Sequence, residues 1–209
     1  MTAASLQKRA LVLAYLTVGY NVLEAALSLL AGALAGSIAL IGFGLDSLVE
    51  SLSGAVIIWR FTPRPGRTPE QEAAAEHRAA RLIGITFFVL GAYVLYESAS
   101  KLYFHDPPSP TLFGLIIAGV SVVLMPALFL YKYRTGQALG SVSVLADSKQ
   151  TLACAFLSLA LLVGLGLNYW FGLWQADPAM GLVVAVYLFR EGYETLKAGK
   201  PCSCCGPCG

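Results

Sequence analysis

The sequence predicts an all-α, polytopic membrane protein with six transmembrane helices and both termini in the cytoplasm. Of its 209 residues, 57% are hydrophobic and only 12% are charged, whereas about 25% are charged in a soluble domain. Six apolar runs follow one another with short connections, and a run of about 20 such residues is long enough to cross a bilayer. This composition leaves no room for a soluble domain, and the net charge of +2 is too small to indicate a nucleic-acid partner.

The predicted spans, in chain order, are Ala10–Leu30, Ile38–Phe61, Leu82–Leu102, Leu112–Tyr131, Val142–Leu167 and Met180–Phe189 with its flanks. The first run superficially resembles a signal peptide, but it is too long, and Asn21 and Glu24 interrupt it. Thr68-Pro69-Glu70 is typical of a helix start, so we expect a short solvated helix leading into the third span.

Orientation follows from the basic residues, which gather on one side of a six-span topology. They precede the first span, surround the second connection, follow the fourth span and end the chain: Lys8, Arg9, Arg60, Arg64, Arg67, Arg78, Arg81, Lys132, Arg134, Arg190, Lys197 and Lys200. Both termini are therefore expected to be cytoplasmic. Lys132 is expected to help anchor the inner end of the fourth span. Glu97 and Lys101, four residues apart near the outer end of the third span, are interpreted as a structural ion pair.

The second span carries two acids near its midpoint, Asp46 and Glu50. Because they are four residues apart, their carboxylates lie on one helix face, close enough to share a ligand. A charged carboxylate at this depth costs about 2.5–3.5 kcal/mol on insertion scales, and a second negative charge beside it adds to the cost. We expect the pair to be protonated, to face a polar cavity or to be neutralised by a cation. The alternative is that both acids pack against partner residues elsewhere in the bundle.

The fifth span contains a stretch, residues 140–156, that matches the second span in spacing. Aligned on the Gly-Ser dipeptide that precedes each span, Gln150 falls opposite Asp46 and Cys154 falls opposite Glu50. The two spans run in opposite directions, which is the pattern of an inverted-topology repeat with a substrate site near the midplane. An amide oxygen, a thiolate and two carboxylates are suitable ligands for a metal site of mixed oxygen and sulfur character.

Other polar residues near this site leave alternatives open. Asp147 lies one turn inward of Gln150 on the same face, and is expected to pass the ion on from the cytoplasm or to act as a ligand itself. Lys149 points away from this face, so it either reaches the inner surface or an acid on another helix, or enters the site as a tethered competitor for the cation. Asn21 and Glu24 either hydrogen-bond to the acid pair or simply pack against a neighbouring helix.

A transmembrane domain is expected over residues 1–200, and a Cys-rich cytoplasmic tail over residues 201–209. The tail holds four of the five cysteines of the chain, namely Cys202, Cys204, Cys205 and Cys208. In a reducing compartment, such a cluster favours binding of a soft metal over formation of disulfides. A palmitoylation site or an unstructured end are the alternatives.

The residues resemble the transmembrane region of the cation diffusion facilitator family of metal transporters, from Lys8 to about Lys197. The resemblance is carried by Gly36-Ser37-Ile38-Ala39-Leu40, Asp46-Ser47-Leu48-Val49-Glu50, Ala146-Asp147, Asp177-Pro178 with Gly181, and Tyr187-Leu188-Phe189-Arg190-Glu191-Gly192. It implies a six-helix bundle, usually a homodimer, in a bacterial inner membrane. It also implies export of Zn²⁺ or a similar divalent ion in exchange for protons, with no fixed cofactor. The family's site falls on Asp46, Glu50, Gln150 and Cys154.

This chain departs from the family at the site and after it. Family members usually have Asp or His at all four places, so Gln150 and Cys154 favour a softer ion such as Cd²⁺. The cytoplasmic metal-binding domain usual in the family has no counterpart in this sequence. We therefore expect a divalent metal transporter, and the alternative is a membrane metal sensor or buffer that does not transport. An enzyme is not expected, because His77 and His105 lie outside the predicted spans and no nucleophile has a base beside it.

Overall fold

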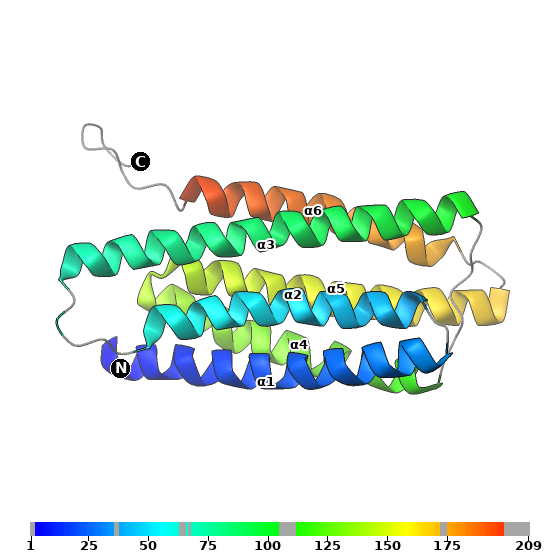
Figure 1. The fold of residues 1–209 in the computed structure, drawn as a ribbon, viewed down its shortest axis with the longest axis horizontal. Helices are drawn as coiled ribbons and strands as arrows, with labels where there is room; N and C mark the ends of the chain where they lie inside the picture. Colours follow the sequence, from blue (N-terminus) through cyan, green and yellow to red (C-terminus); the bar gives the residue numbers. More distant parts are fainter. Residues whose placement is uncertain are drawn as a thin grey trace.

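The computed structural model describes residues 3–35, 38–62, 66, 68–104, 112–171 and 175–198. These residues form the helices α1 (Ala3–Ala35), α2 (Ile38–Phe61), α3 (Pro69–Phe104), α4 (Leu112–Leu139), α5 (Val142–Phe171) and α6 (Ala176–Ala198). The helices run up and down the length of the bundle, so that α1 begins and α6 ends at the same end (Figure 1). We call this the inner end, following the orientation predicted from the basic residues, and the opposite end the outer end.

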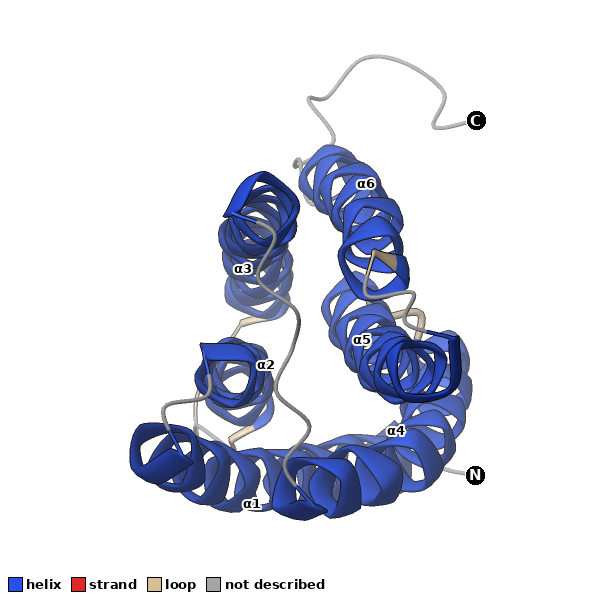
Figure 2. Ribbon diagram, turned by 90° about the vertical axis from the view of Figure 1, so that its right-hand side faces the viewer, coloured by secondary structure: helices blue, strands red, loops and turns tan. Residues whose placement is uncertain are grey.

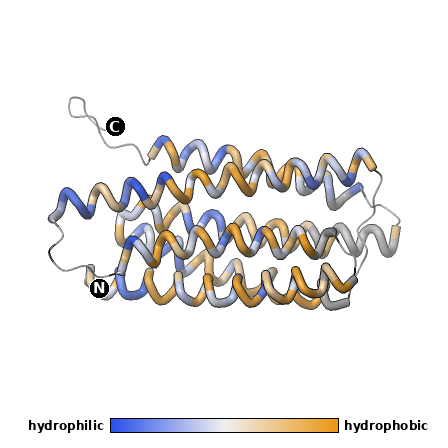
Figure 3. Tube along the Cα trace, viewed as in Figure 1, coloured by the Kyte–Doolittle hydropathy of each residue, from blue (hydrophilic) through white to orange (hydrophobic). Residues whose placement is uncertain are grey.

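The prediction of an all-α bundle of six helices is confirmed, since the part of the chain that is described contains six helices and no strand. Among the residues that the structure describes, four stretches are long and apolar enough by themselves to cross a membrane: Ala4–Ala31, Ile41–Phe61, Pro69–Phe104 and Ile116–Leu139. α5 and α6 fall outside this set and run lengthwise beside it. Figure 3 shows hydrophilic residues gathering toward the inner ends of α3 and α6.

α3 begins earlier than the predicted third span because a reciprocal cap stabilises its start. The N–H of Gln71 donates to Oγ1 of Thr68 (3.3 Å), and the N–H of Thr68 donates to Oε1 of Gln71 (3.2 Å). The helix start at Pro69 was predicted, but as a separate short helix. The structure joins it to the third span in one continuous helix of 36 residues.

α4 also runs beyond its predicted end, to Leu139, and a tight turn then starts α5. Gly140 has a φ of +61°, a left-handed conformation that glycine adopts easily. The N–H of Ser141 donates to the carbonyl of Gly136 (3.1 Å), which closes the end of α4. The Ser141 hydroxyl accepts the N–H of Val144 (3.3 Å) and caps the start of α5.

At the inner end, Glu76 of α3 joins three helices. Its Oε1 accepts the N–H of Ser143 (2.8 Å) and the hydroxyl of Ser141 (2.8 Å), so it also caps α5. Its Oε2 accepts the hydroxyl of Ser143 (2.9 Å) and the guanidinium of Arg60 on α2 (3.1 Å), and Arg60 pairs with Glu72 as well (2.7 Å). A carboxylate is favoured at a helix N-terminus by the helix dipole. We call Arg60, Glu72, Glu76 and Ser143 the inner clamp.

Seen along its length, the bundle has α2 and α3 on one side, α5 and α6 facing them, and α1 and α4 below (Figure 2). The buried apolar core lies between these sides and includes Ile57, Ile83, Phe87, Leu90 and Leu188. The arrangement places the middle of α2 opposite the middle of α5, where the predicted site residues lie.

Substitution of Gly44 tests the close contact between α1 and α2. A Cβ at Gly44 would stand 2.8 Å from Cγ and 3.1 Å from the backbone nitrogen of Leu29, whereas a Cβ at Gly119 of α4 has no neighbour within 4 Å. We expect Gly44→Ala to destabilise the bundle by about 1–3 kcal/mol. Gly119→Ala should leave stability unchanged or raise it slightly, because Ala favours helix. Thermal unfolding in detergent micelles, followed by circular dichroism, measures both; equal midpoints would contradict the packing.

Candidate metal centre

The predicted acid pair lies in the middle of the bundle. Asp46 is 3% exposed and Glu50 is 0% exposed. None of their four carboxylate oxygens has a hydrogen-bond partner among the described residues. Buried carboxylates are normally hydrogen-bonded or paired with a cation, because leaving them bare is costly. The pair is therefore a costly polar feature whose free energy a bound cation would lower.

Gln150 and Cys154 are buried on the facing helix α5, with exposures of 0% and 1%. The thiol of Cys154 is not in a disulfide and lies close enough to Asp46 and Glu50 to interact with both carboxyl groups. Oε1 of Gln150 accepts a hydrogen bond from Thr86 of α3 (3.1 Å). The structure thus brings Asp46, Glu50 and Cys154 together, while the Gln150 carbonyl is engaged by α3.

The side chains of the centre do not converge on one point in this conformation. Within the described ranges, no group of three or more His, Cys, Asp or Glu side chains is arranged to hold a metal ion. Binding of an ion by Asp46, Glu50, Gln150 and Cys154 therefore requires rotamer changes that turn their oxygen and sulfur atoms toward a common centre. The four-ligand site remains a prediction.

Asp147 is paired with a buried lysine. Lys132 of α4 is 1% exposed, and its Nζ lies 2.8 Å from Oδ2 of Asp147 and donates to the hydroxyl of Thr151 (3.0 Å). Oδ1 of Asp147 accepts the hydroxyl of Ser53 on α2 (2.7 Å). The expectation that Lys132 anchors α4 at the membrane surface is wrong. The helix continues to Leu139, so residue 132 lies within the bundle.

The Lys132–Asp147 pair stands on the inner side of the acid pair. Ser53, which bonds to Asp147, follows Glu50 by three residues, or about one helical turn toward the inner end of α2. Lys132 is close enough to Glu50 to interact with it electrostatically. The centre is therefore bordered on its inner side by a buried positive charge that is already paired.

Lys149 does not enter the centre. Its Nζ lies 2.5 Å from Oε2 of Glu191 and 4.0 Å from Oε2 of Glu194, both on α6. Of the three alternatives that the sequence left open, pairing with an acid on another helix is confirmed. The positive charge that interacts with Glu50 belongs instead to Lys132, a lysine that the sequence analysis placed at the surface.

α1 contributes a buried polar group next to the centre. Glu24 is 2% exposed, and its Oε2 accepts the hydroxyl of Ser47 on α2 (2.7 Å). Its Oε1 accepts the hydroxyls of Tyr20 (3.0 Å) and of Ser121 on α4. The amide of Asn21 is fully buried without a hydrogen-bond partner in the described segments. Glu24 is thus bonded to α2 beside the acid pair, but not to the pair itself.

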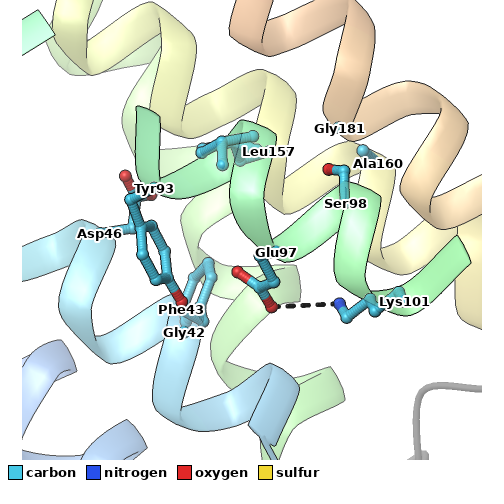
Figure 4. Close-up of a pocket in the computed structure, with 11 residues that line it drawn as sticks. Gly42, Phe43, Asp46, Tyr93, Glu97, Ser98, Lys101, Leu157, Ala160 and Gly181 are labelled. Atoms are coloured by element: carbon cyan, nitrogen blue, oxygen red, sulfur yellow. Dashed lines mark ion pairs between the residues drawn. The ribbon is translucent and has the colours of Figure 1, made fainter. Parts of the chain in front are cut away.

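A cavity of about 70 Å³ lies on the outer side of Asp46, between α2, α3, α5 and α6. Figure 4 shows Glu97 and Lys101 in its wall, joined by an ion pair of 3.1 Å. The sequence reasoning missed this cavity, because it interpreted Glu97 only as the partner of Lys101. A usable signal was Gly42, one turn before Asp46, where the missing side chain leaves room on the same helix face.

The cysteines predicted to bind a soft metal, Cys202, Cys204, Cys205 and Cys208, lie outside the described residues, as does His105. The structure therefore leaves the tail prediction untested.

The fold and this centre define a multi-pass helical membrane protein with unpaired acids at the middle of its bundle. The family model described as the cation efflux transmembrane domain matches residues 14–200. The chain belongs to this family, and the resemblance noted from the sequence is confirmed.

Three curated relatives match most of this chain, and two of them are named as transporters. The chain is 26% identical to an uncharacterized transporter of Synechocystis sp., over 88% of this chain and 61% of that protein. It is 20% identical to transmembrane protein 163 of Xenopus laevis, over 93% and 68%. It is 24% identical to a cadmium, cobalt and zinc/H⁺-K⁺ antiporter of Bacillus subtilis, over 91% and 61%. The chain therefore spans 61% to 68% of the length of these relatives.

Lys132→Met tests the buried ion pair. The substitution keeps most of the side-chain volume but leaves Asp147 without its counter-ion, which costs about 3–5 kcal/mol for a buried pair. The double variant Lys132→Met/Asp147→Asn removes both charges and should be clearly more stable than the single variant. Thermal unfolding in detergent measures both. Arg190→Met, which breaks the exposed pair with Glu194, is the control and should cost less than about 1 kcal/mol. Equal stability of the single and double variants would argue against the pair.

Proposed function

We propose that this protein exports a divalent metal cation from the cytoplasm in exchange for protons, and that the ion binds to Asp46 and Glu50 of α2. The observation that carries the proposal is the acid pair itself, fully buried and without a hydrogen-bond partner among the described residues. Ionisable residues are rare inside a membrane bundle because they are costly, and those that occur there commonly mark ion pathways. Membership of the cation efflux family and the printed name of the Bacillus subtilis relative support it.

The charges of the pair suit exchange of one divalent ion against protons. Two ionised carboxylates carry a charge of −2, which one divalent cation neutralises. When the metal leaves, protons that bind to the carboxylates neutralise Asp46 and Glu50 in the same buried position. Ligands must lose their protons to bind a metal, so metal binding releases protons at the site.

The donors on α5 set the kind of metal. Cys154 supplies a soft sulfur ligand, which favours Zn²⁺ or a softer ion such as Cd²⁺ over Mg²⁺ and Ca²⁺. Gln150 supplies a neutral oxygen once it turns from Thr86. Asp147 can join this set only when Lys132 releases it, since both of its oxygens are otherwise engaged.

The described conformation supports a mechanism in which the centre is reached from one side at a time. On the inner side, the Lys132–Asp147 pair and the inner clamp lie between the acid pair and the end of the bundle. On the outer side, a cavity extends to Asp46. For an ion to enter the centre from the cytoplasm, the contacts of the inner clamp must break. Partly exposed ion pairs such as Arg60–Glu72 are replaced by contacts with water at little cost in free energy.

The proposal also includes the domain boundaries, the metal-binding tail and the homodimer expected from the sequence. The transmembrane domain comprises residues 1–200, and residues 201–209 form a cytoplasmic tail that binds a soft metal through its four cysteines. The active unit is a homodimer in the lipid bilayer of a bacterial inner membrane. A sensor or buffer that binds metal without transporting it is the competing function, favoured by the cysteines of the tail.

Asp46→Asn tests the site. The substitution keeps the shape of the side chain and removes one charge from the pair, so uptake of Zn²⁺ or Cd²⁺ into inverted membrane vesicles should fall by at least about 10- to 100-fold. Glu194→Gln, which alters an acid near the inner end of α6, serves as the control and should keep the wild-type rate. Equal fluxes in the wild type and Asp46→Asn would remove the claim.

Deletion of residues 201–209 separates transport from buffering. A transporter keeps its vesicle flux without the tail, because the central site is intact, while the metal content of the purified protein falls by the share that the cysteines bind. A buffer loses its metal and shows no flux in either form. Metal analysis of both purified proteins, alongside the vesicle assay, decides between the two functions.

A further inference from the structure

The outer cavity contains a second carboxylate that the central site does not use. Glu97 of α3 lines the cavity together with Asp46 of α2. The side chain of Glu97 is 20% exposed, whereas Asp46 is 3% exposed. Figure 4 shows the side chains of Asp46, Tyr93 and Glu97 around the same space. An ion that leaves the central pair by this cavity therefore meets Glu97 before it reaches the outer solution.

Gly42 makes room for this carboxylate. A Cβ at Gly42 would stand 2.7 and 2.8 Å from the two carboxylate oxygens of Glu97, and would also collide with the hydroxyl of Tyr93. Gly42 precedes Asp46 by four residues, so these oxygens lie about 6 Å further out along α2, on the helix face that carries the acid pair. The absence of a side chain at residue 42 thus places three oxygen donors next to the backbone of α2.

The cavity offers the right donors and enough space for a partly hydrated cation. Two carboxylates and a phenol are hard oxygen ligands, which divalent cations accept together with retained waters. A water requires about 10–15 Å³ of such volume, so a cavity of about 70 Å³ holds an ion with a few waters. The buried oxygens of Asp46 are separate evidence for a bound cation, since they have no hydrogen-bond partner in the described part of the chain.

The ammonium group of Lys101 lies where a bound cation would contact the carboxylate of Glu97. Its Nζ lies 3.1 Å from Oε1 of Glu97, and it also lines the cavity. The lysine follows Glu97 by one turn near the outer end of α3, where its long stem allows the ammonium group to turn toward the outer solution. A tethered ammonium of this kind neutralises the carboxylate when no metal is bound, and a divalent ion must displace it.

We propose that Glu97, Asp46 and the hydroxyl of Tyr93 form an outer binding position for a divalent cation, which shares Asp46 with the central pair, and that Lys101 competes with the ion there. The ion rests at this position, partly hydrated, between the central pair and the outer solution. Its place on an export route rests on the proposed function, whereas the binding itself does not.

Binding of Mn²⁺ to the purified full-length chain in lipid nanodiscs tests the position, with free and bound ion distinguished by electron paramagnetic resonance. Mn²⁺ suits oxygen ligands better than thiolate, so it reports on the outer position more than on the centre. Glu97→Gln should weaken Mn²⁺ binding by at least about tenfold, and Lys101→Gln should strengthen it. The control Glu194→Gln also alters a carboxylate in an i,i+4 ion pair, at 3.2 Å from Arg190, and should change nothing.

A second variant tests the geometry without changing any charge. Gly42→Ala pushes the carboxylate of Glu97 and the hydroxyl of Tyr93 away from α2, and should weaken Mn²⁺ binding as Glu97→Gln does. Gly119→Ala adds the same methyl group where no atom lies within 4 Å, and should leave binding unchanged. If Gly42→Ala does not fold, the isosteric Glu97→Gln variant carries the test. Mn²⁺ affinity within twofold of the wild type in Glu97→Gln would overturn the proposal.

Transport assays then separate this inference from the proposed function. Glu97→Gln should raise the KM for metal presented to the outer face and leave the KM at the cytoplasmic face unchanged, because only the outer position is altered. Absence of flux in the wild type, with binding that depends on Glu97, would refute the transport function and keep the outer position. Wild-type flux with an unchanged outer KM in Glu97→Gln would refute the outer position alone.

Discussion

The cost of burying negative charge in the middle of a helical bundle governs this structure. Among the described residues, each buried acid outside the central pair has an evident compensation: Lys132 for Asp147, Lys149 for Glu191 and three hydroxyl donors for Glu24. Asp46 and Glu50 are more deeply buried than Glu191, yet no hydrogen bond to either is found among the described residues. Cys154 and Lys132 lie close enough to interact with this pair, but Asp46 and Glu50 lack the direct ion pair or hydrogen bond that the other buried acids have.

The inner and outer ends of the bundle differ in the contacts that hold the helices together, so the two sides of the centre are not equivalent. At the inner end, helices are joined by directional polar contacts, in which Glu76 both pairs with Arg60 and caps α5. Toward the outer end, glycines at 42 and 181 lie in the wall of a cavity. Ion pairs and caps can break and reform as units, whereas Gly42 and Gly181 leave room for the side chains of Glu97, Tyr93 and Ser98 beside the cavity. This difference between the two ends supports the proposal that the centre is reached from one side at a time.

Lys132 shows where reasoning from the sequence reaches its limit. A lysine after an apolar run is most simply interpreted as a surface anchor, and only the observed continuation of α4 to Leu139 moves it into the bundle. Its partner, Asp147, is fifteen residues further along the chain and reaches it through the tight turn at Gly140. Helix length was underestimated because hydropathy marks where a helix leaves the apolar layer, while capping groups decide where it ends.

The sequence by itself determined that the chain is a six-helix membrane bundle and that Asp46 and Glu50 share one face of the second helix, because composition and a four-residue spacing are local properties. It could not determine which charges neutralise one another. Lys132 rather than Lys149 stands beside the acid pair, and Glu97 shares a cavity with Asp46, because helices distant in sequence pack at a particular rotation and depth. The rotation and the depth of each helix depend on how side chains interlock across the whole bundle, and only the tertiary structure decides them.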